Sequence, residues 1–255
     1  MESPPYFYAL VLFGAALTGA VIYLLTHKQS SKEIKLLLSF SAAYLLGLSF
    51  LHLFPELFLS GVKNAGWYVL GGFMLQVVLD FFSHGIEHGH AHAHKNIGTK
   101  FLISIMASLW IHAFIEGMPF GGAMTSHVHD HSHSHGAEGL HNHDHRGTLL
   151  LGISLHKVTE TLVFTALLIG SGIAKARAIF LIVLFALVAP AGAFVHYFFG
   201  DCGIESLTPK ITGVLIGILL HVSTTIIFES EEGHKFNWIK FLSIILGIGM
   251  AAAVS

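Results

Sequence analysis

Apolar residues fill this chain in long runs, and short polar stretches separate them. A helix that crosses the hydrocarbon core of a bilayer needs about 20 mostly apolar residues at a rise of 1.5 Å each. The sequence therefore predicts eight transmembrane helices, over Tyr6–Thr26, Ile34–Leu59, Ala65–Ser83, Phe101–Gly122, Leu149–Gly170, Ala176–Phe199, Ile211–Phe228 and Phe236–Ala253. Because no stretch between them could fold as a soluble domain, residues 1–255 are predicted to form one all-α, polytopic membrane domain.

The composition agrees with this prediction and excludes other classes. Hydrophobic residues make up 53% of the chain and charged residues 11%, against about 25% charged in ordinary soluble domains. The net charge of −2 gives no sign of the basic surface that nucleic acid requires. A single cysteine, Cys202, allows neither an internal disulfide nor a thiolate cluster. The lipid bilayer is therefore an expected partner, and nucleic acid is not.

The orientation follows from the excess of Lys and Arg that cytoplasmic loops carry. One set of alternate connections holds nine such residues: Lys28, Lys32, Lys35, Lys95, Lys100, Lys175, Arg177, Lys235 and Lys240. The other set holds three: Lys63, Arg146 and Lys210. This asymmetry predicts that both termini are extracytoplasmic.

Histidine is the unusual residue, with 20 copies, most of them in two short tracts. The predicted orientation puts loop 84–99 in the cytoplasm and loop 123–147 outside. Histidine-rich polar tracts bind metal at modest affinity without a fixed fold, although such a loop can also be a dispensable solvated segment. The loop histidines proposed to bind metal are His88, His90, His92, His94, His127, His129, His131, His133, His135, His141, His143 and His145.

Two predicted spans carry ionisable residues near their middle, where such groups are costly and usually functional. Each contains His-x-x-x-Glu, His112 with Glu116 and His156 with Glu160. A separation of four residues places both side chains on one helix face. Counted from the outer helix ends, Glu116 and His156 lie at about the same depth, roughly 12–14 Å. We therefore expect four donors to converge on one ion, although a lone histidine would more often be a hydrogen-bonded interior residue.

Nitrogen and carboxylate donors without a thiolate suit Zn²⁺, with Fe²⁺, Mn²⁺ and Cd²⁺ as the alternatives. Mg²⁺ and Ca²⁺ prefer cages of oxygen atoms. No motif for an organic cofactor is present, so the expected ligands of this chain are divalent metal cations.

Further polar residues mark the ends of two spans. His52 and Glu56 fall near the outer end of the second span, and Asp80 and His84 near the inner end of the third. They are candidates for entrance and exit ligands respectively, with a solvated helix end as the equal alternative. His196 and His221 remain interior residues without an assigned role.

The two His/Glu helices, the histidine-rich loops, the eight spans and the motif His52-Leu53-Phe54-Pro55-Glu56 together resemble the ZIP (Zrt/Irt-like) divalent-metal transporters. The resemblance covers nearly the whole chain. It implies import into the cytoplasm and a 3+2+3 arrangement of two inverted three-helix halves around the metal helices. It also implies that His112, Glu116, His156 and Glu160 are the transport ligands.

Three positions depart from the family pattern: Ala113 replaces the usual Asn, Ile115 a common Pro, and Lys157 a frequent ligand. Some members bind two adjacent metals there. Because Lys157 adds an ammonium where a second cation would bind, we expect a site for one ion. Lys157 is then an interior residue paired with a carboxylate, and as a tethered cation it is a candidate for making transport respond to pH. The alternative is a side chain that snorkels to an interface.

The predicted function is transport of Zn²⁺ or a related cation rather than enzymatic catalysis. An intramembrane zinc hydrolase is one alternative, but no His-Glu-x-x-His helix is present. A divalent-metal exporter of the cation-diffusion type is the other, but that family has six spans and a soluble carboxyl-terminal domain. A homodimer is one option for assembly. The absence of a recognisable signal peptide favours the plasma membrane, with a bacterial inner membrane as the expected location.

Overall fold

In the described residues every regular element is a helix. The computed structural model describes residues 4–26, 31–83, 98–122, 145–200, 207–228 and 237–254. The α-helices are α1 (Pro5–Thr26), α2 (Ser31–Leu48), α3 (Phe54–Leu59), α4 (Ala65–Ser83), α5 (Thr99–Gly117), α6 (His145–Gly170), α7 (Lys175–Ala186), α8 (Val188–Gly200), α9 (Thr208–Phe228) and α10 (Trp238–Ala253). A π-helical turn, η1 (Ser49–Leu53), precedes α3, and a 3₁₀ turn, η3 (Met118–Phe120), follows α5.

Among these residues, 7 helical segments are long and apolar enough to cross a membrane. They are Pro5–Thr26, Glu33–Leu59, Ala65–Ser83, Thr99–Phe120, Arg146–Gly170, Lys175–Phe199 and Thr208–Phe228. The last predicted span corresponds to α10, which is apolar but has 16 residues. It begins later than predicted because the side chain of Asn237 caps the helix, accepting hydrogen bonds from the backbone N–H groups of Ile239 and Lys240. The chain is therefore an all-helical protein of membrane type.

Two of the long segments are interrupted. The second passes through η1 into α3, with Pro55 at the start of α3. The sixth breaks at Leu187, between α7 and α8. Pro190 explains this break, because it lacks the N–H group that would bond the carbonyl of Ala186.

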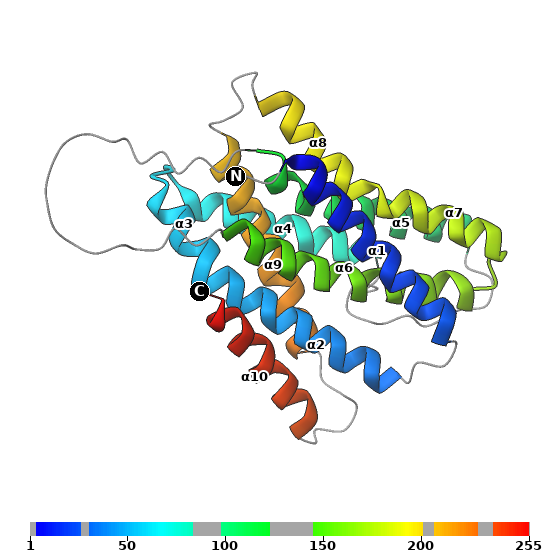
Figure 1. The fold of residues 1–255 in the computed structure, drawn as a ribbon. Helices are drawn as coiled ribbons and strands as arrows, with labels where there is room; N and C mark the ends of the chain where they lie inside the picture. Colours follow the sequence, from blue (N-terminus) through cyan, green and yellow to red (C-terminus); the bar gives the residue numbers. More distant parts are fainter. Residues whose placement is uncertain are drawn as a thin grey trace, which may run out of the picture.

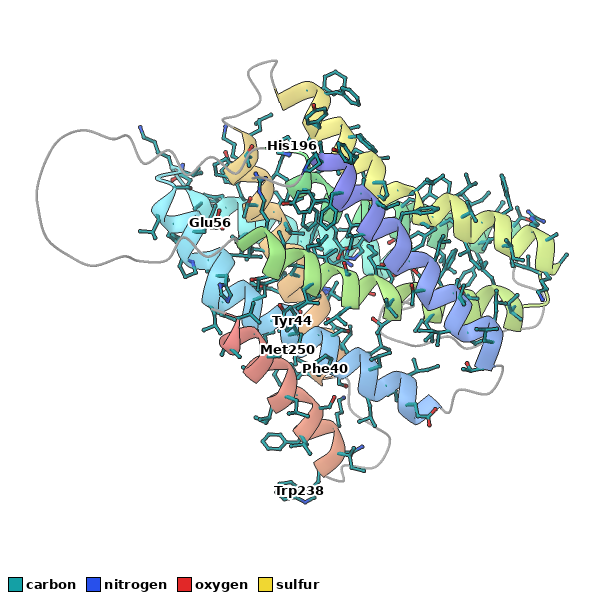
Figure 2. All side chains as sticks on the ribbon, in the orientation of Figure 1. Phe40, Tyr44, Glu56, His196, Trp238 and Met250 are labelled. Atoms are coloured by element: carbon teal, nitrogen blue, oxygen red, sulfur yellow. The ribbon has the colours of Figure 1, made fainter. Side chains whose placement is uncertain are left out.

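The long helices run side by side in one bundle (Figure 1). Four pairs pack most extensively: α2 with α10, α4 with α9, α1 with α6, and α5 with α8. The start of α1 and the end of α10 lie at the same end of the bundle (Figure 1). Figure 2 shows Phe40, Tyr44 and Met250 along the contact between α2 and α10.

Glycines bring two of these pairs into close contact. A Cβ atom at Gly19 of α1 would overlap the carbonyl of Val158 on α6. A Cβ atom at Gly117 of α5 would overlap the carbonyl of Ala189 on α8. Small residues of this kind let helix backbones approach each other in membranes. Both α5 and α6 are thereby held against a neighbouring helix on one side.

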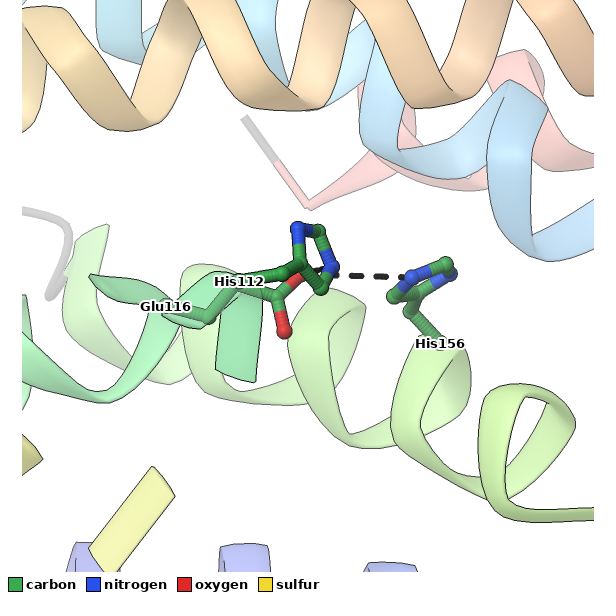
Figure 3. Close-up of side chains that lie close together, drawn as sticks. All are labelled: His112, Glu116 and His156. Atoms are coloured by element: carbon green, nitrogen blue, oxygen red, sulfur yellow. Dashed lines mark ion pairs between the residues drawn. The ribbon is translucent and has the colours of Figure 1, made fainter. Parts of the chain in front are cut away.

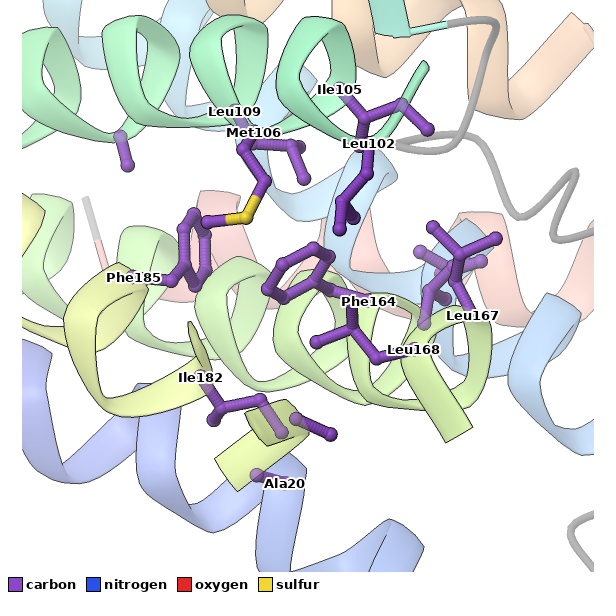
Figure 4. Packing of buried hydrophobic residues seen from close by; sticks show 14 of the residues in the cluster. Ala20, Leu102, Ile105, Met106, Leu109, Phe164, Leu167, Leu168, Ile182 and Phe185 are labelled. Carbon is purple, nitrogen blue, oxygen red and sulfur yellow. The ribbon is translucent and has the colours of Figure 1, made fainter. Parts of the chain in front are cut away.

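Buried apolar side chains form two clusters, one toward each end of the bundle. Figure 4 shows the first cluster, in which α5, α6 and α7 interdigitate. Its larger members include Leu102, Ile105, Met106, Leu109, Phe164, Leu167, Leu168, Ile182 and Phe185. The larger members of the second cluster include Tyr8, Leu12, Tyr44, Leu45, Leu48, Phe120, Leu149, Ile153 and Leu215. Within the second cluster, Tyr8 stacks on Phe120 with ring centroids 5.5 Å apart.

Candidate metal centre

The site begins with two residues of α5. His112 and Glu116 are one helical turn apart, and the Nε2 atom of His112 lies 3.1 Å from Oε1 of Glu116. Both side chains are completely buried. Two ligands bound to one tetrahedral zinc ion at about 2.0–2.1 Å are about 3.3 Å apart, so this spacing suits a shared metal.

The third residue comes from α6. The Nε2 atom of His156 lies 3.9 Å from Oε1 of Glu116, and Figure 3 shows its ring facing His112 and Glu116. The candidate ligand atoms of these three residues all lie within 4.8 Å of one another. Neither ring nitrogen of His156 has a hydrogen-bond partner within the described part of the chain. A buried polar group without a partner is costly, and a bound cation would satisfy it.

Lys157 lies beside this cluster and is almost completely buried. Its Nζ atom is 2.5 Å from Oε2 of Glu116 and 2.5 Å from Oε2 of Glu160. The ammonium also lies 5.4 Å from the ring centroid of Phe185, within the range of a cation–π interaction. The expectation that Lys157 is an interior residue paired with a carboxylate is confirmed.

Glu160 occupies a different place from the other three predicted ligands. One of its oxygens accepts a hydrogen bond from Lys157. The cluster of potential ligands contains His112, Glu116 and His156. Glu160 is connected to this cluster indirectly, because Lys157 forms ion pairs with both Glu160 and Glu116. The structure thus brings three of the four predicted donors together and places the fourth in the adjoining ion pair.

Sequence analysis missed one polar residue of the site, Gln76 on α4. Its side chain is completely buried, and its Oε1 atom lies 3.1 Å from Nδ1 of His112. A signal was present, because Gln76 is a polar residue inside the apolar run 65–83. Gln76 is a neutral amide, however, and a pattern of ionisable residues within the spans does not include it.

The two apolar clusters enclose the site from both ends of the bundle. The first cluster ends at Ala113 on α5, and the second resumes at Phe120 in η3. Along α6 the second cluster ends at Ile153, and the first begins at Val163. Glu116 lies in the first of these intervals, and His156 and Glu160 lie in the second. An ion at this site would be separated from both ends of the bundle by packed side chains.

Three of the proposed entrance and exit residues, His52, Glu56 and Asp80, are described by the structure, and none of them belongs to this cluster. His52 is buried, with Nε2 3.2 Å from the carbonyl oxygen of Ala251. Glu56 is half-buried, with His52 and Arg146 close enough to interact with its charge. Figure 2 places Glu56 toward the end of the bundle where the chain starts. Asp80 is half-buried on α4, one turn beyond Gln76, and His84 lies outside the described residues.

The remaining interior histidines have structural contacts. His196 joins three elements, with Nδ1 2.7 Å from the carbonyl oxygen of Met118 and Nε2 3.1 Å from Oγ1 of Thr208. His221 packs edge-on against Phe73. His196 is therefore an interior residue with both ring nitrogens in contact with protein groups.

The histidine-rich tracts fall outside the described residues. This applies to His88, His90, His92, His94, His127, His129, His131, His133, His135, His141 and His143, and the side chain of His145 at the start of α6 is also outside them. Their metal binding stays a prediction.

Together the core residues can bind one divalent cation through two imidazole nitrogens and a carboxylate oxygen. With neutral imidazoles, Lys157 balances one of the two buried carboxylates, so the cluster has an excess of one negative charge. Three donors of this kind leave a fourth position on a tetrahedral ion for water or another ligand.

The chain matches no model of a known protein family, and a search among curated proteins finds no match either.

Proposed function

We propose that this chain is a membrane transporter, similar to the ZIP carriers, that moves Zn²⁺ or a related divalent cation into the cytoplasm. The observation that carries the proposal is the buried cluster of His112, Glu116 and His156 inside a bundle of apolar helices. Fe²⁺, Mn²⁺ and Cd²⁺ suit the same donors and are the alternative substrates.

The position of the site favours transport over a structural role for the metal. Ionisable residues within membrane-spanning helices are expensive, and those that occur mark ion pathways. Here Glu116, His156, Lys157 and Glu160 lie between the two apolar clusters, and His112 lies at the edge of the first cluster. An ion reaches such a site only if one cluster opens, and alternating access requires the two ends to open in turn.

The proposed topology has eight crossings, both termini extracytoplasmic, and inverted three-helix halves around the metal helices. α1 starts and α10 ends at the same end of the bundle (Figure 1). This placement agrees with an even number of crossings. In this topology α10 must cross with 16 residues, a length of about 24 Å. Such a short helix would require local thinning of the bilayer.

The proposed site holds a single ion. Lys157 occupies the space next to Glu116 and Glu160 where a second cation would need carboxylates. An ammonium and a divalent ion about 4 Å apart repel each other by several kcal/mol at the effective dielectric constant of such sites. Lys157 thus acts as a fixed cation in place of a second metal.

Zinc flux into proteoliposomes tests the proposal. An inward Zn²⁺ gradient is imposed on vesicles that contain wild-type protein, His156→Asn or His196→Asn. His156→Asn removes the Nε2 ligand, whereas His196→Asn replaces a buried histidine outside the cluster and can keep a contact to Met118. We expect saturable flux from wild type and His196→Asn, and little flux from His156→Asn.

Two outcomes would contradict transport through this site. Equal flux from His156→Asn and wild type would place the pathway elsewhere. No flux from folded wild-type protein that still binds one core zinc would instead favour a zinc-dependent hydrolase.

A further inference from the structure

We infer that Gln76 is a positioning residue that holds His112 in the one tautomer able to bind a metal beside Glu116. The inference rests on the proposed function, because it concerns the same site. It adds α4 to the two helices that supply the ligands.

The contact between Gln76 and His112 fixes which ring nitrogen carries the proton. The amide oxygen of Gln76 lies 3.1 Å from Nδ1 of His112. An amide oxygen only accepts hydrogen bonds, so Nδ1 is the donor. A neutral imidazole has a single N–H group, and Nε2 of His112 therefore presents a lone pair.

That lone pair points into the metal cluster. Nε2 of His112 lies 3.1 Å from Oε1 of Glu116, and both atoms are acceptors when the ring is neutral. Two acceptors at this distance repel each other unless a cation lies between them. Gln76 thus prepares a pair of ligands that a metal ion completes. The other tautomer would place an N–H group where the ion must bind.

An amide suits this position better than the carboxylate that orients many zinc-binding histidines. The cluster already holds Glu116 and Glu160 with Lys157 as their counter-charge. A third carboxylate would add negative charge and hold the ion more tightly. Gln76 orients the ring without that charge, which favours release, as transport requires.

A purely structural role for Gln76 makes a different prediction, and Ser108 provides the comparison. The hydroxyl of Ser108 on α5 donates a hydrogen bond of 2.5 Å to the carbonyl oxygen of Leu79 on α4. Ser108 therefore joins the same two helices as Gln76 without contacting a metal donor. If Gln76 served only to join α4 to α5, Gln76→Leu and Ser108→Ala would have similar effects.

The test measures binding to the core site in the full-length chain with the tract histidines replaced by serine. Zn²⁺ affinity is measured by competition titration for this parent and for the variants Gln76→Leu, Gln76→Glu and Ser108→Ala. A further variant of the parent, His112→Ala, identifies the zinc bound at the core site. Zinc that the parent binds and this variant does not is called His112-dependent. ¹⁵N NMR of metal-free protein reports the tautomer of His112, whose signals are identified by the same variant.

We expect Gln76→Leu to weaken zinc binding by about 10–100-fold, the usual effect of losing a group that orients a metal ligand. Gln76→Glu keeps an acceptor and should bind zinc at least as tightly as the parent. Ser108→Ala should leave the affinity unchanged, and the parent should show a protonated Nδ1.

Several results would overturn the inference. One such result is a zinc affinity of Gln76→Leu equal to that of the parent. Another is a loss of zinc affinity in Ser108→Ala as large as the loss in Gln76→Leu. A third is a parent protein in which Nε2 of His112, rather than Nδ1, carries the proton. The last measurement needs no substitution at Gln76 and applies even if Gln76→Leu does not fold. A parent that binds no His112-dependent zinc would overturn the proposed metal site as well. This result distinguishes a failure of the proposed function from a failure of the inference about Gln76 alone.

Discussion

The ammonium nitrogen of Lys157 lies 2.5 Å from Oε2 of Glu116, while Oε1 of the same carboxylate faces two imidazoles. Glu116 is thus shared between a fixed cation and the position of a metal ion. The carboxylate needs a positive partner when the ion is absent, because an unpaired charge in this interior is costly. Lys157 provides that partner.

Lys157→Met should therefore have opposite effects on stability and on zinc affinity. The metal-free protein should lose about 3–5 kcal/mol, the usual cost of removing one partner from a buried ion pair. Zinc should bind at least about tenfold more tightly, because the ammonium no longer repels the ion. Thermal unfolding with and without Zn²⁺, together with competition titration, measures both effects.

Lys157→Arg keeps the charge and serves as the control. Zinc binding by Lys157→Met that is no tighter than wild type would show that the ammonium does not oppose the ion.

The two glutamates of the site should respond differently to loss of charge. Glu116→Gln removes the carboxylate that faces both imidazoles and should abolish core zinc binding. Glu160→Gln changes a group whose oxygen bonds Lys157, so the affinity should fall by less than about tenfold. Zinc titration of both variants with the tract histidines replaced by serine distinguishes the two roles. An equal loss in both would mean that Glu160 becomes a fourth ligand when the ion binds, as the sequence pattern predicts.

The periodic features of this protein could be predicted from sequence. Each predicted apolar run coincides with a helical segment, because length and hydropathy decide whether a segment can lie in a bilayer. The spacing of His112 and Glu116 predicts their contact, since residues four apart share a helix face. Their approach to His156 could be expected from depth alone, because α5 and α6 cross the same thickness.

The details that could not be predicted from the sequence depend on how side chains pack between helices. Whether Glu160 faces an ion or Lys157 depends on rotamers that no spacing rule determines. The contact of Gln76 with His112 joins α4 to α5 over 36 residues of sequence, so no local pattern reveals it. The late start of α10 follows from capping by Asn237, a local signal that a hydropathy reading ignores.

A single methyl group at Gly19 should disturb the site through the backbone of α6. The carbonyl of Val158 occupies the space that a Cβ atom at Gly19 would need, and Val158 directly follows Lys157. Gly19→Ala must therefore push α1 away from α6 or shift the helix that carries His156. Overpacking of this kind costs about 1–3 kcal/mol, and we expect a lower unfolding temperature together with weaker core zinc binding.

Gly14→Ala is the matched control for this change, because it adds the same methyl group to α1 where nothing lies within 4 Å. Thermal unfolding in detergent and zinc titration compare the two variants with wild type. Gly14→Ala should match wild type in both measurements, since its methyl group points into open space. If Gly19→Ala were as stable as Gly14→Ala and bound zinc equally well, close packing of α1 on α6 would not support the metal site. A loss of stability without a loss of affinity would show that the packing holds the bundle together but does not position His156.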